Sequence, residues 1–100
     1  MNAKITLIVA LFVNPNRHAE FERFEARAGE IMSRVGGRIE RRIECSTKDD
    51  SSVPDEVHVV TFPDLESYNR YRESPDLQAL ASLRASAIRK TVVWRGVELQ

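Results

Sequence analysis

The sequence contains a single cysteine, Cys45, among its 100 residues. A lone cysteine cannot form a disulfide within the chain, and this composition fits a reducing compartment. The two histidines, His18 and His58, are far apart, and neither has the spacing to a second ligand that metal sites use. A P-loop, a dinucleotide-binding fingerprint and a Gly-x-Ser-x-Gly motif are also absent. We therefore expect no metal ion, no cofactor and an inert thiol.

The sequence also lacks net charge and long hydrophobic runs. Fifteen basic residues balance fifteen acidic ones, so no overall field draws the chain to nucleic acid or to an anionic membrane. The longest apolar run, residues 5–13, is far shorter than the ~20 residues that cross a bilayer. The residues around this run do not resemble the flanks of a signal peptide. We expect a cytoplasmic protein with no membrane and no nucleic-acid partner.

What the sequence does contain is a clear order of strand and helix patterns. A helix is expected between Asn16, its predicted N-cap, and Gly36-Gly37, with apolar residues three and four positions apart. A second helical region starts near Asp64 and ends before Ser74, and a new helix begins with Pro75 in its first turn and continues to Ala87. Four strands are predicted, at residues 4–13, 38–45, 57–62 and 91–99.

This order predicts an α+β fold of the ferredoxin-like β-α-β-β-α-β type, as a single domain over residues 1–100. Two right-handed crossovers that share one hairpin give a four-stranded antiparallel sheet with helices on one face. The first strand is nevertheless apolar on both of its faces. The face without helices would be a large exposed hydrophobic patch on a monomer. We therefore predict a homodimer in which two sheets pack face to face.

The central hairpin can pair in either of two registers. The favoured register places Ile39 and Ile43 with Val57 on one face of the sheet, because apolar cross-strand pairs stabilise a sheet. A slip by one residue would place His58 beside Arg41 and mix charge into both faces. The favoured register groups His58 with the polar side chains of the neighbouring strand, namely Glu40, Arg42 and Glu44.

Five side chains are candidates for a ligand site. His58 interrupts an apolar strand, and a histidine in a pocket can move a proton. Tyr71 and Trp94 can stack on a planar ligand while Arg84 binds its carboxylate or phenolate. The full candidate set is His58, Arg42, Tyr71, Arg84 and Trp94.

Each candidate also has a purely structural interpretation. His58 can be a hydrogen-bonded core residue, and the aromatic side chains can fill the core. Arg84 can form an ion pair with Glu66 or Asp76. Trp94 can anchor the dimer, because large aromatic side chains favour the centres of interfaces.

Several segments resemble a widespread family of small bacterial proteins known only as a domain of unknown function. The resemblance rests on Phe62-Pro63-Asp64-Leu65-Glu66, Ser74-Pro75-Asp76-Leu77-Gln78-Ala79-Leu80 and Gly36-Gly37-Arg38. That family is similar to the dimeric α+β-barrel superfamily, which implies this fold and a dimer. The superfamily includes cofactor-free monooxygenases, isomerases, haem proteins and ligand-sensing modules. Leu77 departs from the pattern, because the family usually has an aromatic residue there.

Three functions remain open from the sequence. The leading one is a homodimeric module that binds a small, partly aromatic or acidic molecule. The alternative is a cofactor-independent enzyme of monooxygenase or isomerase type, in which His58 moves a proton and Arg84 or Arg42 holds an anionic intermediate. The third is a structural domain without a ligand. RNA recognition is disfavoured, because the strand at residues 57–62 offers one aromatic residue for base stacking.

Overall fold

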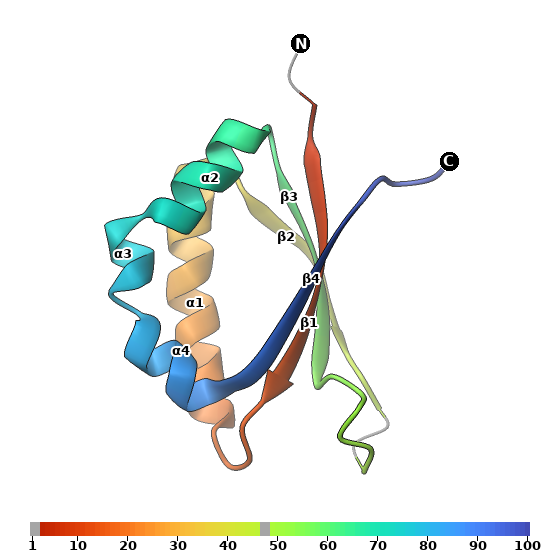
Figure 1. Ribbon diagram of the computed structural model, residues 1–100, viewed down its shortest axis with the longest axis vertical. Coiled ribbons are helices and arrows are strands. Elements are labelled where there is room, and N and C mark those ends of the chain that lie inside the picture. The colour runs from red at the N-terminus through yellow and green to blue at the C-terminus, as the bar shows by residue number, and fades with distance from the viewer. Residues whose placement is uncertain (1–2, 47–48) are drawn as a thin grey trace.

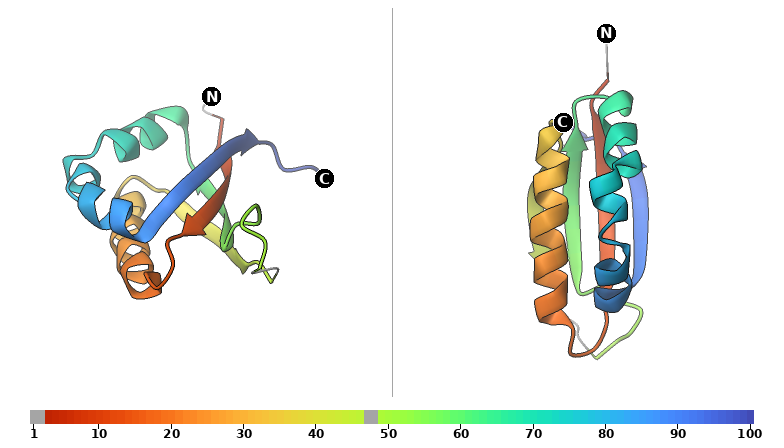
Figure 2. Two further views of the ribbon diagram at one scale, coloured as in Figure 1. Left: turned by 60° about the horizontal axis from the view of Figure 1, so that its bottom comes forward. Right: turned by 90° about the vertical axis from the view of Figure 1, so that its left-hand side faces the viewer.

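A four-stranded antiparallel sheet is covered on one face by helices. The computed structural model describes residues 3–46 and 49–100. The strands are arranged in the order β2-β3-β1-β4, and all helices lie on the same side of the sheet (Figures 1 and 2). This architecture confirms the predicted ferredoxin-like α+β fold. Along the chain the elements are β1 (Ile5–Val13), α1 (His18–Arg34), β2 (Arg38–Glu44), β3 (Glu56–Phe62), α2 (Leu65–Glu73), α3 (Pro75–Gln78), α4 (Ala81–Ala87) and β4 (Ile88–Gly96).

The hydrophobic core lies between the sheet and α1. The buried residues of α1 are Phe21, Phe24, Ala28, Ile31 and Met32. Val35, which the predicted apolar stripe included, follows the end of the helix and is half-buried. The side chains of β1 that point to the helices include Ile5, Leu7 and Leu11, all nearly inaccessible to solvent. Two clusters of buried residues result, one around Phe21 and Ile88 and the other around Phe62 and Ile5.

We call the side of the sheet away from the helices the open face. No element within residues 3–46 and 49–100 covers it (Figure 2). It is strongly apolar, and two of its side chains, Ile43 and Trp94, are 50% and 55% exposed. By the strand registers, the apolar residues of the open face are Ile8, Ala10, Phe12, Ile43, Val57, Val59, Val92 and Trp94. Thr6, Arg41, Thr61 and Lys90 lie on the same face, toward its edges and ends.

The hairpin register agrees with the favoured prediction at one end and departs from it at the other. Arg42 lies opposite His58, and Ile43 lies opposite Val57, as predicted. A β-bulge between Ile39 and Arg41 then shifts the alternation by one residue. Ile39 therefore faces the helices opposite Val60, and the prediction for it was wrong. Glu40 was also placed wrongly: it does not join His58 but accepts a hydrogen bond of 2.9 Å from Thr61 Oγ1 on the open face.

The start of α1 also differs from the expectation. Asn16 is not the N-cap, because the helix begins at His18 and Arg17 precedes it without a side-chain cap. Asn16 instead adopts a left-handed conformation with φ of +62° in the turn after β1. Asparagine tolerates this region better than most residues, which explains its place there.

The last strand begins three residues earlier than predicted. Asn14 closes the end of α4: its backbone N–H donates to Ala87 O, and its side chain donates to the carbonyls of Ala85 and Ser86. The chain therefore enters β4 at Ile88 without a loop. The predicted helix from Pro75 to Ala87 is split into α3 and α4.

Candidate functional site

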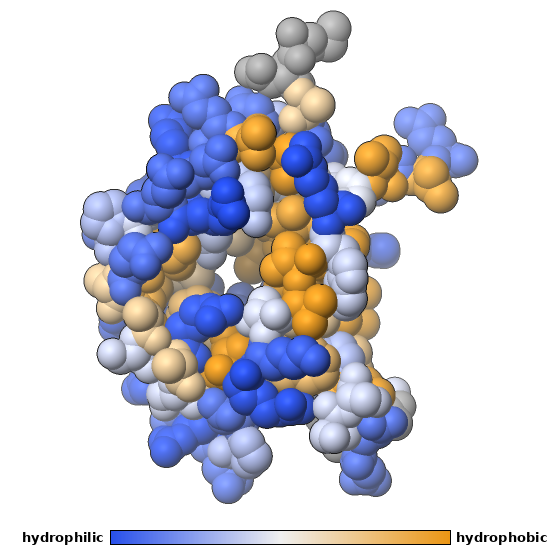
Figure 3. All heavy atoms as spheres, viewed as in Figure 1, coloured by the Kyte–Doolittle hydropathy of each residue, from blue (hydrophilic) through white to orange (hydrophobic). Residues whose placement is uncertain are grey.

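A cavity of about 500 Å³ lies between the sheet and the helical layer. Figure 3 shows the hollow, with hydrophilic residues on its rim and hydrophobic residues toward the sheet. Most of its lining is apolar, and residues from β1, β3, β4 and each helix contribute. Its volume falls within the range typical of small-molecule sites. Apolar lining residues include Val9, Phe24, Met32, Val60 and Val93.

His58 lies on the cavity wall in the middle of β3. Its alternation with Val57 and Val59 turns the imidazole toward the helices, and its side chain is only 3% exposed. The ring Nε2 lies 2.8 Å from Glu56 Oε1, which is two residues earlier on the same face of the strand. His58 is therefore a hydrogen-bonded buried histidine, and it also borders the cavity.

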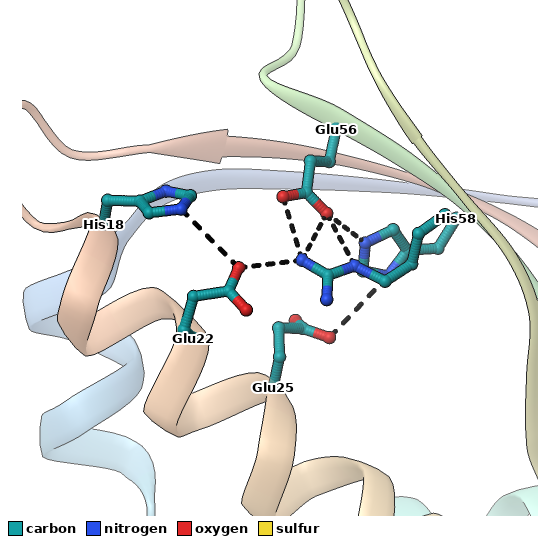
Figure 4. A network of polar contacts seen from close by, with 6 residues as sticks. His18, Glu22, Glu25, Glu56 and His58 are labelled. Atoms are coloured by element: carbon teal, nitrogen blue, oxygen red, sulfur yellow. Dashed lines mark hydrogen bonds and ion pairs between the residues drawn. The ribbon is translucent and has the colours of Figure 1, made fainter.

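Arg42 binds the other side of the Glu56 carboxylate. Its Nε donates to Glu56 Oε1 at 2.9 Å and its Nη2 to Oε2 at 3.0 Å. The same Nη2 donates to Glu22 Oε1 at 2.8 Å, which joins β2 and β3 to α1 (Figure 4). The hydrogen bond from Arg42 lowers the pKa of Glu22, and the two carboxylates raise the pKa of Arg42. A carboxylate that is held by a guanidinium accepts hydrogen bonds, so His58 Nε2 carries the hydrogen that points to Glu56.

Glu25 approaches the other nitrogen of the imidazole from α1. Its Oε2 lies 3.7 Å from His58 Nδ1, and its side chain is 11% exposed. Burial in the apolar cavity wall raises the pKa of Glu25 to about 7. The imidazole therefore lies between two carboxyl groups, one bound to Arg42 and one that exchanges its proton near neutral pH (Figure 4).

Tyrosines and arginines from the second helical region complete the cavity. Tyr71 packs against Phe62 with ring centroids 5.5 Å apart, and burial raises the pKa of its phenol to about 12. Arg72 stacks over the Tyr68 ring, with its Cζ 4.6 Å from the centroid. All these tyrosines and Arg72 are lining residues.

Arg84 lines the cavity from α4 and is bonded to the sheet. Its Nη2 donates to Thr91 Oγ1 at 2.8 Å. The proposed ion pair with Glu66 or Asp76 was wrong, since Asp76 pairs with Arg34 at 2.6 Å. Within the part of the chain that the structure describes, no carboxylate pairs with Arg84.

The structure brings together three of the five predicted residues and separates one. His58, Tyr71 and Arg84 line the same cavity, and Arg42 lies behind Glu56 without lining it. Trp94 does not contribute, and the prediction that it stacks on a ligand in this cavity was wrong. Strand alternation turns Val93 into the cavity and Trp94 to the open face, opposite Ile8.

Glu25 and Glu56 were missed in the sequence, although both left a signal. Glu25 follows Phe21 by four residues and precedes Ala28 by three, so it occupies the buried stripe of α1. A glutamate in that stripe is expensive to bury and is therefore a candidate for function. Glu56 precedes His58 by two residues, which places both side chains on one face.

The described residues hold neither a cluster of metal-binding side chains nor a helix that could span a membrane. Among residues 3–46 and 49–100, no group of three or more histidine, cysteine, aspartate or glutamate side chains is arranged to hold a metal ion. No helix within these residues is long and apolar enough to cross a bilayer.

Solved structures of similar fold cover nearly the whole chain. A protein of unknown function from Rhodopseudomonas palustris has a TM-score of 0.81 at 13% identity, covering 100% of this chain and 85% of its own. SnoaB, a cofactor-independent oxygenase from Streptomyces nogalater, has a TM-score of 0.72 at 18% identity, covering 100% and 96%. A dabb family protein with a ferredoxin-like fold from Mesorhizobium loti has a TM-score of 0.67 at 24% identity, covering 97% and 98%. At these identities the likeness establishes the fold alone.

Sequence comparison establishes the family. No protein of curated function matches the chain. The model of the family described as domain of unknown function DUF1330 matches residues 6–97, and the chain therefore belongs to that family.

Proposed function

We propose that this chain is one subunit of a homodimer that binds a small, mostly apolar molecule in the cavity between the sheet and the helices. The observation that carries the proposal is a cavity of about 500 Å³ whose apolar wall is interrupted by His58 and Glu25, with side chains 3% and 11% exposed. Burying ionisable groups costs free energy that packing alone does not require, so such groups in a pocket favour a binding role.

The homodimer is supported by the apolar character of the open face. The apolar open face, with Ile43 and Trp94 half exposed, is the surface that a second copy would cover.

The experiment on the cavity uses 2-naphthol, a neutral two-ring probe, and methyl NMR of the valines. Val9, Val60 and Val93 line the cavity, while Val57 and Val59 lie on the open face and serve as internal controls. We expect saturable shifts of the cavity methyl groups and none on the open face. The absence of any saturable shift at the cavity valines contradicts the proposal.

A second function, proton transfer, is favoured by the contacts of His58. Its Nε2 is bound to Glu56, and its other ring nitrogen, Nδ1, lies 3.7 Å from Glu25 Oε2 at the cavity wall. A carboxylate that fixes the tautomer of a histidine is a common arrangement in general acid–base catalysis. Glu25, with a pKa of about 7, can supply or accept the proton at neutral pH. SnoaB, which has a similar fold, is named as a cofactor-independent oxygenase, and proton transfer by His58 would likewise need no cofactor.

The test of proton transfer is hydrogen exchange in a bound carbon acid. With 2-tetralone in D₂O, we expect the wild-type chain to accelerate exchange of the hydrogens next to the carbonyl. His58→Gln should remove about 100-fold of that acceleration, because a positioned base contributes at least this much. Equal rates for the two proteins, with 2-tetralone bound to both, would leave the chain as a binding module.

A further inference from the structure

The cavity has a cationic side chain, Arg84, that is hydrogen-bonded to no carboxylate of the described residues, although its charge acts to lower the pKa of Glu25. Arg84 lines the cavity, and its single hydrogen bond goes to the neutral hydroxyl of Thr91. Within the described ranges, Glu22 and Glu56 form ion pairs with Arg42 and not with Arg84. Arg84 is exposed to solvent at the cavity, and its remaining N–H donors are accessible to an anion that enters the apolar space.

Thr91, the hydrogen-bond partner of Arg84, and His58 lie on strands on either side of β1. Thr91 is on β4 and His58 is on β3, with β1 between them in the sheet. Neighbouring strands are about 4.8 Å apart, so two spacings separate the two positions by about 10 Å across the sheet. The wall between them is apolar and includes Val9 and Leu11 of β1. A ligand that contacts both ends needs an apolar body with one polar group at each end.

The acidic group that faces the same space is Glu25. Its carboxyl lies against His58, and its raised pKa leaves it largely protonated at pH 6. Tyr71 also remains an uncharged phenol there. The second arginine on the lining, Arg72, is held by Tyr68 and Asn69. Below neutral pH, the described side chains that line the cavity therefore carry a net positive charge.

On the basis of the binding function proposed above, we propose that the cavity selects amphipathic organic anions, with a carboxylate bound by Arg84 and the apolar body directed toward His58. The anion supplies the partner that the protein does not give to Arg84. The fork of the guanidinium binds a planar carboxylate through two parallel hydrogen bonds. Thr91 holds this fork in place from the sheet.

The experiment compares two probes that differ by one carboxylate, 2-naphthol and 6-hydroxy-2-naphthoate, at pH 6. We expect the wild-type chain to bind the acid about tenfold more tightly than the neutral probe, by isothermal titration calorimetry. Arg84→Leu should remove this preference and leave the affinity for 2-naphthol unchanged. Arg84→Lys should retain part of the preference, since it keeps the charge and loses the fork.

The matched control is Arg23→Leu, which removes the same charge from an exposed position of α1 outside the cavity lining. It should leave both affinities unchanged, and thermal melting of each variant verifies that it is folded. If Arg84→Leu keeps the wild-type preference, or Arg23→Leu loses it equally, the anion site is refuted and the neutral cavity stands. If neither probe binds the wild-type chain, the anion site and the proposed binding function fail together.

Discussion

Glu25 illustrates how one buried carboxyl group links stability to pH. Its pKa rises from an ordinary value of 4.5 to about 7, because burial disfavours the charged form. The folded state therefore holds a proton that the unfolded state has lost between these two pH values. As the pH rises through this interval, stability decreases, and the full penalty is present above pH 7. The free-energy cost of keeping Glu25 in the chain is thus largest in mildly alkaline solution.

Replacing Glu25 by glutamine should reveal this penalty. Glutamine keeps the shape and the helix propensity but cannot ionise. We expect Glu25→Gln to become more stable relative to wild type as the pH rises. The difference in their free energies of unfolding should increase by about 2 kcal/mol between pH 5 and pH 8. Urea denaturation at both pH values measures the gain. Glu30→Gln, on the exposed side of α1, is the control and should show no such gain; a pH-independent difference for Glu25→Gln would contradict the raised pKa.

At the scale of elements, the end of α1 depends on two glycines with different roles. Gly36 adopts a φ of +82° after the helix, and the N–H groups of Gly36 and Gly37 bind Ser33 O and Met32 O, which forms a Schellman motif. Gly37 is constrained by packing instead. A Cβ there would lie 2.5 Å from Met32 Cγ and 2.5 Å from Phe62 Cε1. The second glycine therefore lets β2 start close against the core.

Alanine substitutions should separate this packing effect from helix propensity. We expect Gly37→Ala to cost about 1–3 kcal/mol, because the added methyl group overpacks the core. Gly29→Ala, in the middle of α1, meets no atom within 4 Å and should instead gain about 0.5–1 kcal/mol. Thermal and urea unfolding measure both. A Gly37→Ala variant as stable as wild type would show that Met32 and Phe62 move aside freely.

Local sequence patterns were sufficient to predict some of the element boundaries and not others. The Asp64 cap was predicted and is present: its side chain accepts from Ser67 N at 2.8 Å. Pro75 in the first turn of α3 was also predicted correctly. The bulge at Glu40 was not predictable, because it depends on Thr61 of the neighbouring strand. The early start of β4 likewise depends on Asn14, which is distant in the sequence.

For the whole molecule, the open face makes a quantitative prediction about assembly. We expect the chain to sediment with twice its mass of 11.4 kDa and to bury more than ~1,200 Å² in total. Trp94→Asp should give a monomer at micromolar concentration, because it places a charge at an apolar interface. Arg95→Ala is the control, since Arg95 is adjacent in sequence but lies on the opposite face of β4. A monodisperse wild-type monomer refutes the homodimer.

The sequence by itself determined the fold of this protein. The fold could be predicted from local signals, namely the alternation of strand residues, the spacing of apolar residues in α1, and the glycines and prolines that end the elements. The order of these elements is compatible with one common topology. The same alternation indicated an apolar open face and grouped His58 with Arg42.

Only the tertiary structure decided the composition of the site. Whether Trp94 or Val93 faces the cavity depends on the pairing of β4 with β1, and one position in register reverses it. The approach of Glu25 to His58 joins a helix to a strand more than thirty residues away in sequence. The shift of the Glu25 pKa and the hydrogen bond of Arg84 to a neutral hydroxyl follow from this packing, because burial and bonding partners are properties of neighbours in space.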